Sequence, residues 1–380
     1  MLQQRILGLA AAPAASGASV PVASEAGHGP DEHEICGVGW FNIEGDKPSV
    51  LDVVRIGRQI DLPTGRRQTV DALRDDKNDR AQAMAVLLAG LGNEDHEFSF
   101  DLIGRLADIA SRSMDPVLYG FVLRTCGHVR SKDSSCRLLS PAQWARLDPG
   151  NAAPWFELLA SAVAARDAAA RSEALHRIAS SDRNVGYEGV MPRVILDHAP
   201  AGDHGALIAS LLGVEAVGIE AAWVRYYPAV TSSCSSIALT DANRRQICSA
   251  VAELLVERSG DRLDQAVGVK LGESLGWPTD RTDRRRGESQ AYFGALAHSF
   301  TADEDLACTT VRRNLDSFRA QADSGDVGRQ RRWIAASGRT AEEFTALGRK
   351  QREAMVESRS RQEREGAAAA SSSPASVAAR

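Results

Sequence analysis

Apolar residues recur at helical spacing along most of the chain. Met84, Leu87, Leu88 and Leu91 fall at positions i, i+3, i+4 and i+7, which form one face of an α-helix. Later stripes have the same spacing and are separated by polar turns; they cover Leu102–Ala110, Leu118–Val122, Trp155–Val163, Leu175–Ala179, Leu207–Leu212, Ile247–Leu255 and Cys308–Phe318. The sequence therefore predicts an all-α protein of antiparallel helical hairpins, stacked in an irregular repeat-like array.

Residues that favour helix ends mark several of the boundaries. Ser140 and Pro141 are typical of an N-cap and of the first helical position, and Asp241 is a second expected N-cap. Two capping boxes, Thr301-x-x-Glu304 and Thr340-x-x-Glu343, predict two further helix starts.

The pattern divides the chain into five segments. Residues 1–33 are expected to be a disordered leader or a weak signal peptide, with Val22-Ala23-Ser24 as the possible cleavage site. Residues 34–68 are expected to be poorly structured apart from a strand or hairpin at 34–45, and 61–79 shows no sustained period. A repeat-like helical region at 69–200, a second helical region at 201–365 with a mixed-charge loop at 280–288, and a disordered tail at 366–380 complete the chain.

The junction between two of the expected helices carries the clearest family signal. Leu147 ends one helix, Asp148-Pro149-Gly150-Asn151 forms a turn, and the next helix begins near Trp155. Asp-Pro also occurs at Asp115-Pro116, 33 positions earlier. In these features the chain resembles the tetratricopeptide repeat family, whose helical hairpins recur about every 34 residues.

The resemblance covers residues 115–182. Trp155 and Leu158 match the first-helix pair of the family, Leu175 matches a second-helix packing position, and Pro149 matches the closing Pro of the preceding unit. The resemblance implies that these four residues are anchors of a hairpin, with Trp155 buried. It implies a binding or scaffolding role and carries over no catalytic residue.

The chain departs from the family pattern at several positions. Arg171 replaces the usual small residue, no Pro closes the unit at Arg183, and Pro141 stands where a packing residue belongs. About three stacked repeats are usually needed for a stable array, so the flanking helices are expected to complete the core.

Composition excludes two classes of partner. The chain has 45 basic and 50 acidic residues and a formal net charge of −5, which gives no field that would recruit nucleic acid or an anionic membrane. No run approaches the roughly 20 apolar residues that span a bilayer. The expected partner is another protein or peptide, with no cofactor and no membrane span.

The six cysteines leave two interpretations open. Cys126 and Cys136 are close in sequence, as are Cys234 and Cys248, and neither pair has a CxxC pattern. They are candidate structural disulfides of an exported protein, which places it in the periplasm or outside the cell. The alternative is that the cysteines are buried free thiols in a cytoplasmic protein.

Candidate chemical groups are few. His28, His33 and Cys36 offer zinc-type ligands at a spacing that fits no standard site. The pairs Asp197-His198 and Asp203-His204 suit acid–base work, but Asp203 is better interpreted as a helix cap and the histidines as solvated loop groups.

Other polar and aromatic clusters also have a structural interpretation. The run Ser232–Ser236 lacks the surroundings of a nucleophile elbow, and the basic groups at 281–286 and 329–332 lie among acidic residues. Trp155 and Tyr226-Tyr227 are expected in the core rather than in a ligand site. No catalytic, cofactor-binding or metal-binding residue is therefore assigned.

These observations favour a non-enzymatic protein–protein interaction or scaffold module of a bacterial cell envelope. A secreted or injected bacterial effector is the first alternative, because the leader resembles secretion leaders. An all-α enzyme with an unfamiliar site is the second, and it requires that Asp197, His198, Asp203 and His204 converge on one pocket.

The intact mass of the protein from its native host distinguishes the two cysteine interpretations. If the protein is exported, we expect loss of about two dozen leading residues and thiols that alkylate only after reduction. A full-length chain with six reactive thiols would contradict the disulfide interpretation.

Overall fold

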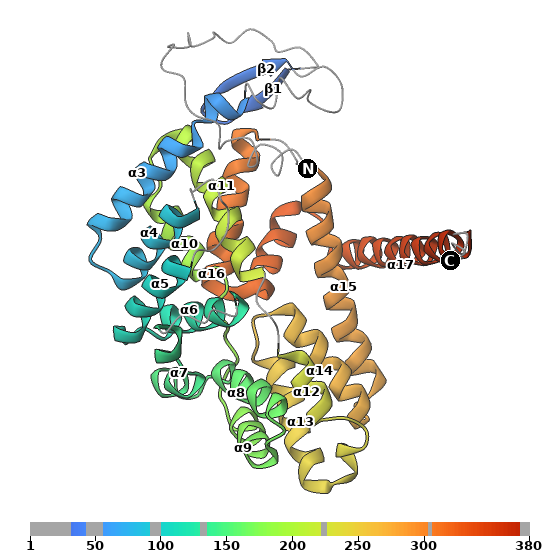
Figure 1. Ribbon diagram of the computed structural model, residues 1–380. Helices are drawn as coiled ribbons and strands as arrows, with labels where there is room; N and C mark the ends of the chain where they lie inside the picture. The colour runs from blue at the N-terminus through green and yellow to red at the C-terminus, as the bar shows by residue number, and fades with distance from the viewer. Residues whose placement is uncertain are drawn as a thin grey trace, which may run out of the picture.

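The computed structural model describes residues 32–42, 56–91, 100–129, 135–221, 226–302 and 306–372. Within these ranges the chain forms fifteen α-helices and one two-stranded hairpin (Figure 1). The expected all-α fold is confirmed. A tetratricopeptide-type arrangement of the helices stays a prediction.

Helices from three parts of the chain form a first lobe around one cluster of buried side chains. Leu73, Leu87, Trp144 and Leu211 lie in this cluster and are at most 1% exposed. The helices are α3 (Leu62–Asp75), α4 (Asp79–Leu91), α5 (Phe100–Arg112), α6 (Pro116–Val129), α7 (Pro141–Leu147), α10 (Val190–His198), α11 (Gly202–Ala221) and the first part of α16 (Cys308–Ser337).

α11 is the central helix of this lobe. It packs against α3, α6, α10 and α16. Among the described residues it is the one helix long and apolar enough to cross a membrane by length and composition, with a mean hydropathy of 1.2 over Gly202–Glu220. Because 56% of that window is buried inside the fold, its apolar surface is already covered by the neighbouring helices.

A second lobe has its own core. Its helices are α8 (Ala153–Ala164), α9 (Ala168–Ala179), α12 (Tyr227–Ser233), α13 (Ala242–Glu257) and α14 (Arg262–Leu275). Phe156, Leu175, Val251 and Leu255 are fully buried in it. The ring of Phe156 stacks on that of Tyr226, with centroids 4.2 Å apart.

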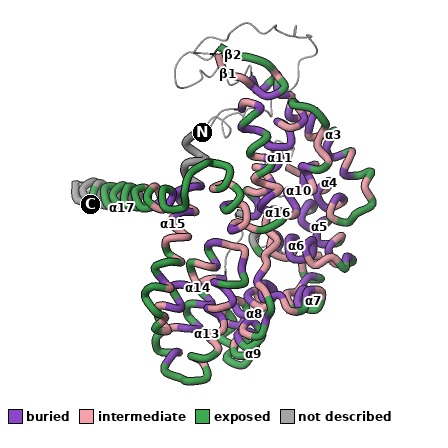
Figure 2. The backbone as a smooth tube through the Cα atoms, turned by 180° about the vertical axis from the view of Figure 1, so that it is seen from behind, coloured by how far each residue is buried: buried purple, intermediate pink, exposed green. Residues whose placement is uncertain are grey.

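Three long helices join the lobes and leave them. α15 (Thr279–Ala302) follows the second lobe, α16 runs from the first lobe toward it, and α17 (Ala341–Ser372) projects away from both (Figures 1 and 2). α16 is kinked at Gly325, whose φ of 65° suits glycine. Just after the kink, the Val327 amide donates to the Gly260 carbonyl of the second lobe at 3.0 Å.

The hairpin consists of β1 (Glu32–Ile35) and β2 (Gly39–Asn42), with Glu34 opposite Trp40. It confirms the strand or hairpin expected at 34–45, although β1 begins two residues earlier, inside the segment expected as leader. Gly37 turns the chain with a φ of 70°. A Cβ at this position would lie 2.0 Å from the His204 backbone nitrogen, so only glycine fits the contact with the start of α11.

Several expected helix starts are confirmed. The Ser140 hydroxyl accepts from the Gln143 amide at 3.2 Å, and the Asp241 carboxylate accepts from the Arg244 amide at 2.7 Å. The second capping box is complete, because Glu343 Oε2 accepts from the Thr340 amide at 2.8 Å and the Thr340 hydroxyl accepts from the Glu343 amide at 3.2 Å. The first capping box is wrong, since Thr301 lies at the end of α15 and α16 begins at Cys308.

Three other expectations require correction. α3 begins within the segment 34–68, which was expected to be poorly structured, and lies in the stretch 61–79, which shows no sustained period. Its buried face includes Gly65 and Thr69, so a hydrophobic count misses it. Residues 280–288 are helical rather than a loop, because ion pairs such as Arg285–Glu288 at 2.9 Å link successive turns of α15. α17 continues to Ser372, into the segment expected as a disordered tail.

The implied repeat anchors do not all lie in the core. Pro149 is exposed, Trp155 and Leu158 are half-buried, and Leu175 is fully buried. Phe156 takes the central place that was expected for Trp155. The ring of Trp155 instead lies under the guanidinium of Arg177, with Cζ 5.5 Å from the ring centroid.

The difference between these two aromatic residues is measurable. Replacement of Phe156 by Ala is expected to lower the free energy of unfolding by about 3–5 kcal/mol, because it opens a cavity in the second core. Replacement of Trp155 by Ala is expected to cost about 1–2 kcal/mol, since part of its surface is already solvated. Urea unfolding of the two variants under oxidising conditions compares them, and a larger loss for Trp155→Ala would contradict the assignment.

Candidate functional site

The two histidines singled out in the sequence do not form an acid–base pair. His198 Nδ1 lies 2.7 Å from the Val194 carbonyl, and its Nε2 lies 3.2 Å from Asp76. His204 Nε2 lies 2.7 Å from the carbonyl oxygen of Ile60. Each ring thus links its own helix, α10 or α11, to the α3 region.

Their neighbouring carboxylates also have separate roles. Asp197 pairs with Arg193 on the same helix, and Asp203 pairs with Arg312 of α16 at 2.6 Å. Asp203 lies in the first turn of α11 rather than at its N-cap, because the helix begins at Gly202. The convergence of all four residues that an enzyme site would require does not occur.

The serine-rich run and the first basic cluster are part of the scaffold. Cys234, in the middle of the run, is bonded to Cys248. Arg281 pairs with Glu253 and Glu257 at 2.6 and 3.0 Å, and its guanidinium lies 3.7 Å from the ring centroid of Trp277. The guanidinium of Arg281 is thus occupied by neighbouring groups.

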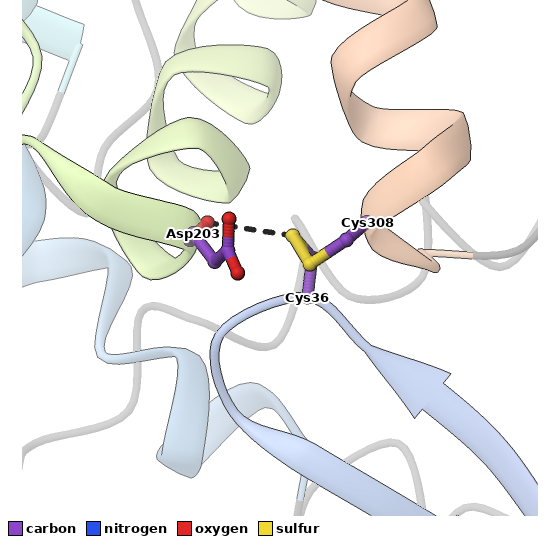
Figure 3. A group of neighbouring side chains, drawn as sticks. All are labelled: Cys36, Asp203 and Cys308. Carbon is purple, nitrogen blue, oxygen red and sulfur yellow. Dashed lines mark hydrogen bonds between the residues drawn. A yellow bond between two sulfur atoms is a disulfide. The ribbon is translucent and has the colours of Figure 1, made fainter.

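A third disulfide joins residues that are remote in sequence. Cys36 in the hairpin turn is bonded to Cys308, the first residue of α16, across a separation of 272 positions (Figure 3). The Cys36 sulfur also lies 3.5 Å from the Asp203 carbonyl oxygen. These three residues are close enough to surround a metal ion, but the sulfurs are bonded to each other and offer no thiolate.

Among the described residues, the zinc-type ligands noted in the sequence do not form a site. His33 is exposed on β1, whereas Cys36 is buried, and His28 lies outside the described residues. The Cys126–Cys136 and Cys234–Cys248 bonds match the pairs expected from sequence. All six cysteines are oxidised.

Buried polar groups meet where the helix-connecting turns come together. Asp148 accepts hydrogen bonds from the Asn151 amide at 2.6 Å and from the Tyr187 hydroxyl at 2.8 Å, and it pairs with Arg183. Burial, and then the hydrogen bond to Asp148, raise the pKa of Tyr187.

A second cluster of buried polar residues, around Asp264, lies in the second lobe. Asp264 accepts from Asn184, Tyr226 and Ser259 at 2.6, 2.8 and 2.7 Å, and it is 3% exposed. Burial, followed by the Asp264 charge, raises the pKa of Tyr226 well above its usual value. We call the two carboxylates and their partners the polar junction; it consists of Asp148, Asn151, Arg183, Asn184, Tyr187, Tyr226, Ser259 and Asp264. Both carboxylates are surrounded by donors, as in a structural network, although the buried Oδ1 of Asn184 has no hydrogen-bond partner.

The most distinctive surface is the part of α17 that leaves the fold. At its base α17 crosses α15 closely: a Cβ on Gly294 would lie 2.1 Å from the Phe344 carbonyl oxygen, and one on Gly348 would lie 2.0 Å from that of Gln290. Phe344 is fully buried at this crossing, beside Trp333 and Leu347. The crossing fixes the direction of α17.

Beyond the crossing, Gln351 is half-buried and the described side chains that follow it in α17 are exposed. Val356 is 61% exposed, and Arg352, Glu353 and Ser358 are also exposed. Both tube and ribbon views show the helix extending into solvent (Figures 1 and 2). We call residues 351–372 the arm.

The arm continues the face that packs on α15. Steps of three and four residues from Phe344 and Gly348 reach Gln351, Met355, Ser358 and Gln362 in turn, and none of these residues is charged. We call these last four positions the arm stripe. Every charged residue from 349 to 364 lies on the remaining faces, and Glu365 closes the stripe.

The segment that precedes the arm is positively charged, in contrast to the whole chain with its net charge of −5. Residues 329–350 contain six basic and two acidic residues, whereas the arm itself contains four of each. From sequence alone the capping box at Thr340 predicts the start of a helix in this segment, with a disordered tail from residue 366. The arm stripe distinguishes one face of this helix because it lacks charge. It contains glutamine and serine, so a search for apolar residues at helical spacing does not find it.

No family model, curated protein or solved structure matches this chain.

The base of the arm contains a tyrosine with a shifted pKa. Tyr292 of α15 accepts a hydrogen bond from Arg329 of α16 at 3.2 Å. Burial, and then the charge of Asp326, raise the pKa of Tyr292 to about 12. Because the pKa of an unfolded tyrosine is about 10, the contribution of this group to stability is present below pH 10 and is lost as the pH rises toward 12.

This shift predicts a late step in the alkaline titration. Absorbance at 295 nm, read within milliseconds of a pH jump, should show a phenol that ionises near pH 12. This ionisation near pH 12 should be absent from the Tyr292→Phe variant, and the absorbance spectrum of the variant at pH 8 should otherwise match that of the unmodified protein. Ionisation of Tyr292 near pH 10 would show that it is solvated and that the packing at the base of the arm is wrong.

Proposed function

We propose that this chain is a non-enzymatic protein–protein interaction module and that the arm is its contact element. The arm carries the proposal because it is a well-defined helix that extends beyond the fold and keeps one uncharged face. In proteins most of the stability of a helix comes from packing of one face against other elements. Contact with another protein gives the arm stripe the packing that α15 gives to Phe344 and Gly348.

The three disulfides support a location in an oxidising compartment, such as a bacterial cell envelope or its exterior. A bond between residues 36 and 308 closes most of the chain into one loop, which strongly restricts the unfolded state. A protein that acts outside the cytoplasm benefits from this covalent stabilisation.

The acid–base candidates support a role without catalysis. His198, His204 and Asp203 each connect two helices, and Asp264 is surrounded by its own donors. A catalytic group needs access to a substrate, and these groups are committed to contacts within the fold.

Site-specific photo-crosslinking in the native host tests this function. A photoreactive residue at Ser358, in the arm stripe, is expected to give a discrete crosslinked species. The same residue at Ile237, which is 82% exposed on the second lobe, is the matched control and is expected to give none.

Deletion of the chain after residue 350 is expected to abolish the proposed contact with the partner protein in the host. The disulfides and the helical spectrum of the remaining protein are expected to persist. Crosslinking from both positions at equal yield would indicate random collision, and absence of crosslinking at Ser358 would contradict the proposal.

A further inference from the structure

The Cys36–Cys308 disulfide differs from the other two in its surroundings. Its two sulfurs and a carboxylate oxygen of Asp203 all lie within 4.8 Å of one another (Figure 3). Within the described part of the chain, this is the one place where three ligands of the kind that metals use come together. Two thiolates and a carboxylate suit zinc, whereas calcium and magnesium prefer oxygen ligands alone.

Other contacts hold the two cysteines together independently of the bond between them. The Cys36 amide donates to the Leu306 carbonyl at 2.9 Å, and the Cys308 amide donates to Glu34 Oε2 at 3.3 Å. Gly37 lies directly on the start of α11, where the space admits only glycine. The hairpin turn therefore stays beside α11 and α16 when the sulfurs are reduced, and the ligands need no large movement to reach a metal ion.

The position of the cluster in the fold favours negative charge. Cys308 is the first residue of α16, and Asp203 lies in the first turn of α11, so the cluster lies at the N-terminal ends of two helices. The positive end of a helix dipole stabilises a thiolate, which is the form that binds a metal. Arg312 occupies Oδ1 of Asp203, but its side chain is 61% exposed, and such an ion pair is weak in water.

A tetrahedral zinc site needs four ligands, and the cluster supplies three of them. The fourth position is available to water or to Glu34, whose carboxylate already contacts the Cys308 amide. His33 does not belong to the set, because successive side chains of a strand point to opposite faces and this one is exposed.

We propose that the reduced chain binds one zinc ion through the sulfurs of Cys36 and Cys308 and the carboxylate of Asp203, and that oxidation replaces this site by the disulfide. Zinc binding displaces one proton from each thiol. On oxidation the two thiolates pass two electrons to a disulfide oxidant, which takes up two protons and becomes a dithiol, while the zinc ion returns to solvent.

The zinc ion takes the place of the covalent bond in a reducing compartment, where the disulfide does not persist. In both states the hairpin turn is tied to α16, first by the metal and then by the bond. This site lies apart from the arm and does not depend on the function of the arm.

Zinc titration of the full-length chain in its two redox states tests the proposal. The protein is reduced with a phosphine, separated from it under nitrogen, and titrated with Zn²⁺ in competition with a fluorescent chelator. One tight equivalent is expected for the reduced chain and none for the oxidised chain. With Co²⁺ as the probe, a sulfur-to-cobalt charge-transfer band is expected in the reduced chain alone.

Matched variants locate the ligands. Cys36→Ser combined with Cys308→Ser is expected to abolish tight binding by the reduced chain, and Asp203→Asn is expected to weaken it about tenfold or more. Cys126→Ser combined with Cys136→Ser removes the same number of thiols from a pair that has no such carboxylate, and it is expected to leave the affinity unchanged.

Several results would overturn the site. One is the absence of tight binding by the reduced chain, and another is a loss of its helical spectrum that zinc does not restore. Binding that survives the Cys36→Ser and Cys308→Ser changes would place the metal on other thiols. Unchanged affinity in Asp203→Asn would remove the third ligand, and equal zinc uptake by the oxidised chain would show that the thiolates are not needed.

Discussion

The polar junction is the constraint on which the arrangement of the lobes depends. The two hydrophobic cores are separate, so apolar packing within each does not fix how they meet. The Asp182–Asn184 segment forms parallel bridges in two directions, Asn151 to Arg183 and Asn184 to Ser259. Because the carboxylates of Asp148 and Asp264 are buried, any displacement of the lobes would leave a charge without donors, which costs far more than a displaced apolar contact.

α16 and the Cys36–Cys308 bond complete this constraint from the other side. α16 begins at the disulfide and the first core, passes Gly260 at its kink and ends beside the arm crossing. The hairpin turn is thereby held on the start of α11, where Gly37 allows the close approach to His204. α16 thus connects the disulfide and both lobes to the crossing of α15 and α17, and that crossing sets the direction of the arm.

The elements that were predictable from sequence are those whose signal is local. Strong apolar stripes and caps such as Ser140 and Asp241 identify helices, since spacing and side-chain acceptors act within one turn. α3 was missed because Gly65 and Thr69 are buried on its packed face, and Phe156 was missed because a rotation of one residue exchanges it with Trp155. The Cys36–Cys308 pair and the polar junction join residues remote in sequence, and no local pattern encodes such contacts.

The arm is an element whose helical structure is predictable from local sequence but whose contact face is not. Its mixed charges predict a helix, and opposite charges four residues apart, such as Glu357 and Arg361, favour that helix in solvent. The spacing of residues along the sequence does not show at which residue of α17 the contact with α15 ends. α15 covers Phe344 and Gly348, and the same face then continues without it through four uncharged positions. A face selected only for solubility would have no reason to exclude charge over this length, whereas a face that packs against another helix must exclude it at every turn.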